Sequence, residues 1–254
     1  IRTYLEKNEI EFLPLKRVAI REIKRAFQKF HPDIIHAHDF RTSVLAALAK
    51  LEAPIISHLH NNPPWIRTFH PYSIAYLLSS SRYFKILGVS SSIFTEYIFG
   101  KNLMDKAIVM SNPIDGSRIV RKARECATYK NNSYHAVFIG RLAPQKNPMR
   151  FIKIMSMIID KEPTFKVAVI GDGHLYKDCL SLVNSLNVSK NIHFLGFVEN
   201  PYCILSQASA LCMTSDYEGF GLVAVEALAL GIPVVAFPVG GIPSIINSTC
   251  GFLA

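Results

Sequence analysis

Two glutamates, separated by seven residues, are the first candidates for chemistry. Glu218 lies in a loop punctuated by glycines, and Glu226 is the only charged residue between positions 222 and 239. Burying a carboxylate without a partner is strongly unfavourable, so each needs a cation, a hydrogen-bond donor or a ligand. Sugar and ribose hydroxyls are suitable donors, so this spacing indicates a carbohydrate or nucleotide ligand.

The elements around these glutamates are predicted from hydrophobicity and glycine positions. Residues 210–214 form an apolar run typical of a buried parallel strand, residues 216–221 a loop, and residues 222–230 a helix rich in strong helix formers. The loop glycines bring the chain to a helix N-terminus, where free backbone N–H groups favour phosphate. A membrane span would need about 20 apolar residues, and Glu226, Gly231 and Pro233 argue against one.

Two further loops follow predicted strands. One carries Arg141, whose planar guanidinium can bind two oxygens at once, and Lys146, whose ammonium is a compact charge; together they suit a diphosphate. The alternative is that both are ordinary solvated cations on a surface loop. The other carries Gly171 and Gly173 but lacks the third glycine of a dinucleotide-binding fingerprint. His174, beside it, is expected to be an incidental loop residue.

The segment Glu218-Gly-Phe-Gly-Leu-Val-Ala-Val-Glu226 resembles the donor-site motif of retaining glycosyltransferases of the GT-B fold, in particular glycosyltransferase family four. The downstream segments 231–236 and 240–243 resemble that family as well. The likeness covers nearly the whole chain and is strongest from 139 to 251. Two departures are Ser244, where relatives often carry Glu, and Asn112-Pro-Ile-Asp115, where many carry Asn-Gly-Val-Asp. The second recurs among polysaccharide enzymes and suggests surface-glycan synthesis.

The resemblance implies a role for each candidate residue. Arg141 and Lys146 would neutralise the leaving diphosphate, Glu218 would hold the donor sugar and Glu226 the ribose diol. The remaining donor-binding candidates supply backbone groups near the nucleoside, base and phosphates: Gly171, Gly173, Phe197, Val198, Gly219, Phe220, Gly221 and Leu222. His60, at the end of a strand over 54–60, matches a family histidine near the transferred sugar. His58, on the same side of that strand, is the alternative candidate for this role. His36 is expected to pack inside the protein rather than to act in the site.

No cofactor or metal is expected. The chain has no Asp-x-Asp motif, and side-chain cations would replace a bound Mg²⁺. No second carboxylate is placed as a nucleophile, so we expect front-face attack by the acceptor, with charge stabilisation on the diphosphate as the main catalytic contribution.

Strands alternate with helices twice along the chain, which predicts parallel sheets covered on both faces. We expect an α/β protein of GT-B type, with two Rossmann-like domains facing a cleft. The expected boundaries are 1–115 for a partial acceptor-side domain, 116–132 for a polar linker, and 133–254 for the nucleotide-sugar domain. The chain lacks an initial Met and resembles a fragment, so we expect it to bind donor without transferring sugar.

The charge is uneven along the 254 residues. Residues 1–132 hold 20 Lys and Arg against 11 Asp and Glu, whereas residues 133–254 hold 8 against 8. No nucleic-acid motif accompanies this excess, so the basic helix predicted over 17–30 is either a solvated face or a contact with anionic lipid. Five cysteines without a Cys-x-x-Cys pair favour reduced thiols in a cytoplasmic protein. The basic first half favours a peripheral place at the inner face of the plasma membrane.

The sequence therefore predicts a glycosyltransferase that takes a sugar from a nucleoside diphosphate donor to a carbohydrate or lipid-linked acceptor. Two alternatives stay open. One is a GT-B-fold sugar-nucleotide epimerase or phosphorylase, and the other is a non-catalytic sugar-nucleotide-binding subunit.

Overall fold

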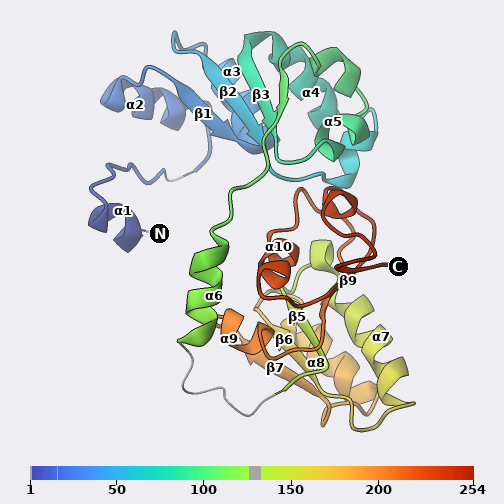
Figure 1. Cartoon of the computed structure of the whole chain (residues 1–254). Coiled ribbons are helices and arrows are strands. Elements are labelled where there is room, and N and C mark those ends of the chain that lie inside the picture. The colour runs from blue at the N-terminus through green and yellow to red at the C-terminus, as the bar shows by residue number, and fades with distance from the viewer. Residues whose placement is uncertain (1, 16, 126–132) are drawn as a thin grey trace. The chain divides into compact units, whose positions relative to one another are not determined.

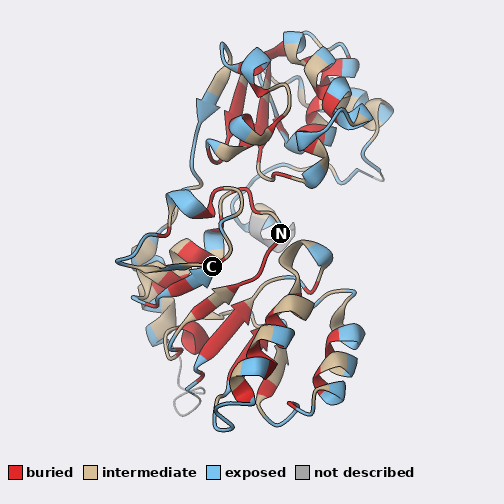
Figure 2. Ribbon diagram, turned by 90° about the vertical axis from the view of Figure 1, so that its right-hand side faces the viewer, coloured by how far each residue is buried: buried red, intermediate tan, exposed pale blue. Residues whose placement is uncertain are grey.

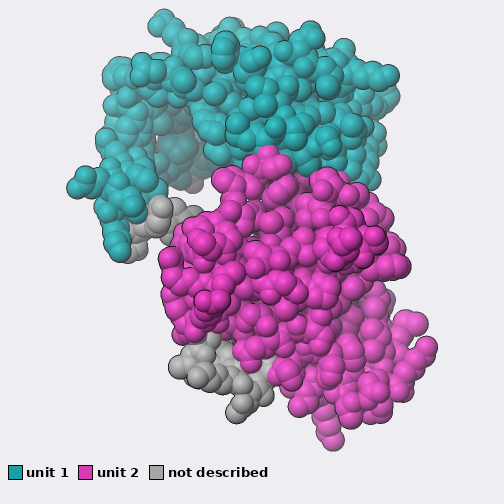
Figure 3. Space-filling model, in the orientation of Figure 1, with its two compact units in different colours: residues 1–60, 64–110 teal, residues 61–63, 111–254 magenta. Residues whose placement is uncertain are grey.

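The computed structural model describes residues 2–15, 17–125 and 133–254. The chain divides into two compact units (Figure 3). Unit 1 comprises residues 1–60 and 64–110, and unit 2 comprises residues 61–63 and 111–254. Each unit is built around its own parallel sheet.

Unit 1 contains a four-stranded sheet in the order β1-β2-β3-β4, with every neighbouring pair parallel. Its strands are β1 (Ile35–His38), β2 (Ile55–Leu59), β3 (Tyr83–Gly88) and β4 (Ala107–Val109). Its helices are α1 (Arg2–Lys7), α2 (Ile20–Phe30), α3 (Asp39–Leu48), α4 (Pro71–Ser79) and α5 (Ser92–Glu96), with short 3₁₀ turns η1 (Pro64–Arg67), η2 (Ser80–Arg82) and η3 (Gly100–Leu103).

Unit 2 contains a six-stranded sheet in the order β10-β9-β8-β5-β6-β7, again all parallel. Its strands are β5 (Ala136–Ile139), β6 (Val167–Ile170), β7 (Ile192–Gly196), β8 (Leu211–Met213), β9 (Val234–Ala236) and β10 (Gly251–Leu253). Its helices are α6 (Gly116–Arg124), α7 (Pro148–Ile159), α8 (Tyr176–Ser185), α9 (Tyr202–Leu205) and α10 (Leu222–Ala229), with 3₁₀ turns η4 (Pro144–Lys146) and η5 (Ile242–Ser244).

The strand order of unit 2 reverses between β5 and β8. From β5 the chain builds outward through β6 and β7, then returns to place β8 on the other side of β5 (Figure 1). Open parallel sheets bind ligands outside the carboxyl ends of their strands at such a switch point. The loops after β5 and β8, which carry the strongest candidate residues, therefore meet where a ligand is expected.

Alternating residues of the central strands fill two separate cores. On one face, Phe138 and Val169 pack with Phe151 and Ile152 of α7, and on the other Val137 and Ala168 pack near Ile204. Successive side chains of a strand point to opposite faces, so both faces are covered. Figure 2 shows the resulting band of buried strands. This packing fixes the strand ends from which the site loops emerge.

Residues 116–124 differ from the predicted linker. They form α6, which packs within unit 2 against α9 and α10. Asp115 caps the helix by accepting a hydrogen bond from the Arg118 N–H at 2.9 Å, and Ile119 is buried. The prediction of a linker rested on the polar composition of this segment, which holds only Ile119, Val120 and Ala123 as apolar residues. The units also divide at 110/111, earlier than the predicted 115/116, and residues 126–132 of the linker lie outside the described residues.

The structure also bears on the predictions of a basic helix and of reduced cysteines. The basic helix begins at Ile20 rather than Arg17 and has no buried residue. Cys179, Cys212 and Cys250 are free thiols, but Cys203 is disulfide-bonded, against the prediction of reduced cysteines, and Cys126 lies outside the described residues. None of the helices in the described ranges is long and apolar enough to cross a membrane.

Candidate functional site

The loops after β5 and β8 are joined by hydrogen bonds. Thr214 donates its hydroxyl to the carbonyl oxygens of Lys146 (3.2 Å) and Asn147 (3.0 Å). In return, the Asp216 N–H donates to the carbonyl of Gln145 at 2.9 Å. Asn147 adopts left-handed backbone geometry (φ 46°), caps α7 and donates from its side chain to Asp216. These bonds hold the two loops as one surface.

Lys146 and Glu218 meet on that surface. The Nζ of Lys146 lies 2.5 Å from Oε1 of Glu218, and the Ser215 hydroxyl donates to the same oxygen at 2.7 Å. The Glu218 side chain is 6% exposed and that of Lys146 is 19% exposed, so the pair is largely withdrawn from water. The structure thus brings two of the predicted catalytic residues into direct contact.

Glycines permit the close approach of neighbouring loops. A Cβ on Gly171 (φ 133°) would overlap the carbonyl of Gly140, and one on Gly173 would overlap the carbonyl of Leu142. Gly240 (φ 55°), in the loop after β9, lies against the Glu218 carbonyl in the same way. Only glycine combines this geometry with so little space. The predicted glycines therefore pack the loop after β6 onto the loop after β5.

The first turn of α10 follows directly. Gly221 has left-handed geometry (φ 94°) at the N-cap of α10 and, as a glycine, offers no side chain to cap this end. The first N–H groups of a helix have no intrahelical partner, so an uncapped end is an anion-binding position. The segment Gly219, Phe220, Gly221 and Leu222 leads from Glu218 into this turn.

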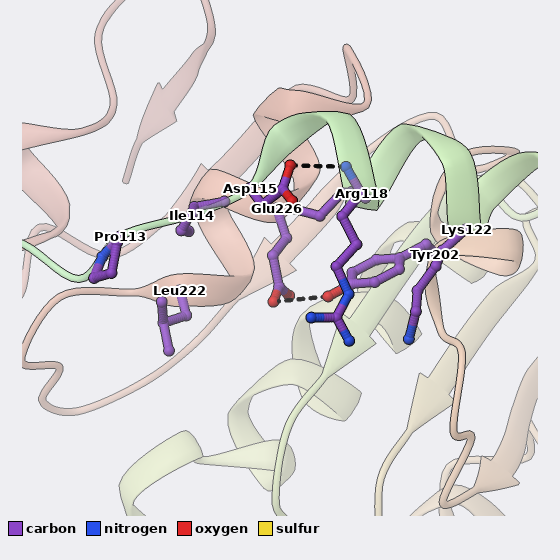
Figure 4. Close-up of a pocket in the computed structure, with 9 residues that line it drawn as sticks. Pro113, Ile114, Asp115, Arg118, Lys122, Tyr202, Leu222 and Glu226 are labelled. Atoms are coloured by element: carbon purple, nitrogen blue, oxygen red, sulfur yellow. Dashed lines mark hydrogen bonds between the residues drawn. The ribbon is translucent and has the colours of Figure 1, made fainter. Parts of the chain in front are cut away.

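Glu226 lines a separate cavity of about 310 Å³ within unit 2 (Figure 4). The cavity is enclosed by α6, α9, α10 and the segment before α6, and its lining residues are Pro113, Ile114, Asp115, Arg118, Ile119, Lys122, Tyr202, Leu222 and Glu226. Tyr202 donates its hydroxyl to Oε1 of Glu226 at 3.0 Å. Figure 4 shows Arg118 extending from α6 toward this pair. The cavity thus combines two carboxyl groups, those of Asp115 and Glu226, with two cations.

The titration of this pair reflects its burial. Burial raises the pKa of Glu226 above its ordinary value, and the hydrogen bond from Tyr202 offsets part of that effect. Burial, followed by the neighbouring Glu226 charge, raises the pKa of Tyr202 to about 12. Tyr202 therefore stays protonated at neutral pH and acts as a hydrogen-bond donor.

The remaining predicted residues of unit 2 are more dispersed. Arg141 is exposed on the loop after β5, and no side-chain partner is present for it among the described residues. Phe197, after β7, is 82% exposed, whereas Val198 packs partly against the core beside Ala168 and Ile170. An exposed ring and an unpaired guanidinium are free to meet a ligand, but the structure does not gather them with Lys146 and Glu218.

His60 belongs to a cluster of four histidines in unit 1. Its Nε2 lies 2.7 Å from Nδ1 of His38, and its backbone N–H donates to Asp39 at 3.2 Å. Burial lowers the pKa of His60, while the Asp39 carboxylate opposes that shift. His58 is buried, and burial with the neighbouring histidines lowers its pKa to about 4. Both imidazoles are therefore neutral at pH 7.

Sequence reasoning missed several side chains that shape these sites. Ser215 supports Glu218, and Tyr202 supports Glu226. Arg118 and Lys122 went unnoticed because their helix was assigned to a linker. The Asp115 cap followed by buried Ile119 is the signal that could have revealed that helix.

Two family models match the chain. The model described as Glycosyl transferases group 1 matches residues 121–254, more than half of the chain, and that of Glycosyltransferase Family 4 matches residues 8–118. An uncharacterized glycosyltransferase of Methanocaldococcus jannaschii is 25% identical over 85% of this chain and 58% of its own length. The lipopolysaccharide 1,6-galactosyltransferase of Escherichia coli is 24% identical over 85% and 59%. The chain thus spans about three fifths of the length of these relatives.

Solved structures agree on the fold. Anabaena Alr3699/HepE, crystallised with UDP-glucose, matches with a TM-score of 0.81 and 23% identity over all of this chain and 74% of its own. That similarity establishes the GT-B fold predicted from the sequence. Because the first of the two family models matches more than half of its residues, the chain belongs to the family Glycosyl transferases group 1, with its first half matching Glycosyltransferase Family 4.

Proposed function

We propose that this chain binds a nucleoside diphosphate sugar in unit 2 and belongs to a retaining glycosyltransferase acting on a carbohydrate or lipid-linked acceptor. The observation that carries the proposal is the contact of Lys146 with Glu218 at the switch point between β5 and β8. A lysine and a carboxylate side by side suit a ligand that joins a diphosphate to a sugar. Family membership supports the same conclusion.

The chemistry proposed for the donor site is charge stabilisation. Lys146, exposed Arg141 and the uncapped N-terminus of α10 would receive the negative charge that grows on the diphosphate as the glycosidic bond breaks. Glu218 would bind the donor sugar and Glu226 the ribose. Supplying this charge from side chains and backbone would leave no need for a metal ion at the donor site.

The cavity around Glu226 supports the ribose assignment. Tyr202 occupies one carboxylate oxygen, and the other can accept from ligand hydroxyls. Arg118 and Lys122 border the same cavity, so an anionic nucleotide would meet two cations there, beside the carboxyl groups of Asp115 and Glu226. Gly171, Gly173, Phe197 and Val198 would flank the nucleoside and base.

His60 is proposed to lie near the transferred sugar during the reaction. Its imidazole is held by His38 and its backbone by Asp39, so its position is defined. We propose front-face attack by the acceptor with retention, because no second carboxylate is placed as a nucleophile among the residues that the structure describes. Surface-glycan synthesis is the proposed context; one relative is a lipopolysaccharide galactosyltransferase by name.

The proposed setting is cytoplasmic, at an anionic membrane surface. Arg21, Lys24 and Arg25 are exposed on α2, and the helix has no buried residue. Juxtaposed cations on an amphipathic helix suit anionic lipid. Co-sedimentation with vesicles of anionic and of neutral lipid tests this: equal binding to both would contradict it.

The donor assignment is tested by ligand binding followed by product analysis. Thermal shift with UDP-, GDP- and ADP-sugars should single out one base, and NMR of the transferred sugar should show retained anomeric configuration. Transfer that requires added Mg²⁺ would contradict the metal-free donor site. Loss of the acceptor requirement would favour an epimerase, and donor binding without turnover in the whole protein would favour a binding subunit.

A further inference from the structure

Four histidines of unit 1 lie on two neighbouring strands. His36 and His38 are alternate residues of β1, and His58 and His60 lie at and just beyond the end of β2. The strands pair in parallel, with His38 opposite His58. Alternate residues of a strand share a face, so the register brings all four imidazoles together on one side of the sheet.

The ring nitrogens of three of these histidines lie close enough together to bind one metal ion. His36 Nε2 lies 3.2 Å from His58 Nδ1, and the potential ligand atoms of His36, His38 and His58 all lie within 4.8 Å of one another. Zinc bonds imidazole nitrogen at about 2.0–2.1 Å, which in a tetrahedral site separates two ligand nitrogens by about 3.3 Å. The contact also has the length of a hydrogen bond, so it shows that the rings of His36 and His58 are close enough to bind one ion.

One nitrogen of the cluster lacks a partner. His58 is only 8% exposed, and its Nε2 has no hydrogen-bond partner among the residues that the structure describes. Buried polar side-chain atoms are nearly always hydrogen-bonded, so such an atom calls for an explanation. The contact with His36 engages Nδ1 of His58, so Nε2 is the nitrogen of this ring that is left to bind an ion.

We propose that His36, His38 and His58 form a binding site for one divalent transition-metal ion of the zinc class. Imidazole nitrogen is a preferred ligand for zinc, copper and nickel. His60 would act from outside the metal's ligand set, since its hydrogen bond to His38 is the kind of contact that orients a metal-binding imidazole. All three residues belong to unit 1, and a metal site there departs from the expectation of no metal ligands.

The experiment uses the full chain without an affinity tag, stripped with chelator and titrated with Zn²⁺ by calorimetry. One ion per chain is expected, and Co²⁺ in its place should give the visible absorption of a nitrogen-ligated site. His36→Ala, at an exposed position, should weaken Zn²⁺ binding by about 100-fold or more, since loss of outer contacts alone costs 10- to 100-fold. His58→Ala should act likewise.

His174→Ala is the matched control, because His174 is an exposed histidine in unit 2 outside the cluster. It should leave Zn²⁺ affinity unchanged. Circular dichroism and nucleotide binding by unit 2 check that each variant is folded, so misfolding and loss of the metal site are distinguishable. Absence of Zn²⁺ binding to the wild type, or equal affinity in folded His36→Ala, would overturn the proposal.

Discussion

Replacing Lys146 with methionine tests whether its contact with Glu218 holds the two site loops. The substitution removes the ammonium group but keeps an unbranched side chain of similar length. Glu218 would then keep only the Ser215 hydroxyl as a partner for Oε1, in a position where its side chain is 6% exposed. An unpaired carboxylate in such surroundings is strongly disfavoured.

The size of the effect follows from the burial of the pair. Breaking a buried ion pair by removing one partner typically costs about 3–5 kcal/mol. Lys146 is 19% exposed and Ser215 remains, so a loss near the lower end, about 3 kcal/mol, is expected. For a domain of this size each kcal/mol moves Tm by about 2–4 °C, which gives a shift of about 6–12 °C.

The assay is thermal and denaturant unfolding of three variants. Lys146→Met combined with Glu218→Gln should recover most of the lost stability, because the unpaired charge is gone. Asp216→Asn is the matched control on the same loop: it breaks an ion pair to Arg150 whose side chains are 38% and 42% exposed, and should cost less than about 1 kcal/mol. The reasoning fails if Lys146→Met costs no more than this control, or if the double variant recovers nothing.

Three further outcomes are expected. Gly240→Ala should destabilise the protein much more than Gly231→Ala, because its Cβ would overlap the Glu218 carbonyl. At Gly231 a Cβ meets open space, so only the left-handed strain of about 1–2 kcal/mol is expected. Equal losses of stability in denaturant unfolding would contradict the loop packing. Glu226→Gln should become more stable relative to wild type as pH rises from about 4 to 7. Burial raises the pKa of Glu226 in the folded state above its ordinary value of 4.5, so ionising this carboxyl at higher pH destabilises the wild type but not the variant. A difference in the free energy of unfolding that stays constant with pH would refute this. Arg118→Ala should weaken nucleoside diphosphate binding about 10-fold in calorimetry, whereas Arg124→Ala, on the same helix but outside the cavity, should not.

Much of the fold could be predicted because its strands are short apolar runs bounded by glycine and proline. The strand predicted over 210–214 contains β8, and the helix predicted over 222–230 matches α10 to within one residue. Helix α6 was missed because its nine residues are mostly polar and only Ile119 is buried, although the Asp115 cap marks its start. Tertiary contact with α9 and α10, rather than the local pattern, stabilises it.

The residues of the site could be predicted from the sequence, but their contacts could not. Lys146 and Glu218 are 72 residues apart, and their contact depends on β8 returning beside β5, which the predicted alternation of strands and helices allowed but did not specify. The partner of Glu226 could not be foreseen, since Tyr202 lies in a four-residue helix without a sequence signal. The histidine cluster was overlooked because it requires the register of β1 against β2, and that register is a property of the paired strands.

The most direct test of the account is calorimetry of UDP and GDP binding to the wild-type chain and to Glu226→Ala. A carboxylate hydrogen bond to a ribose hydroxyl is worth about 1.5–3 kcal/mol, so the variant should bind about 10- to 150-fold more weakly. Glu199→Ala, an exposed acid in the loop after β7, serves as control and should bind as the wild type does. Tight binding by wild type with this selective loss is the predicted result. A folded Glu226→Ala with unchanged affinity, or a wild-type chain that binds no nucleoside diphosphate, would contradict the account.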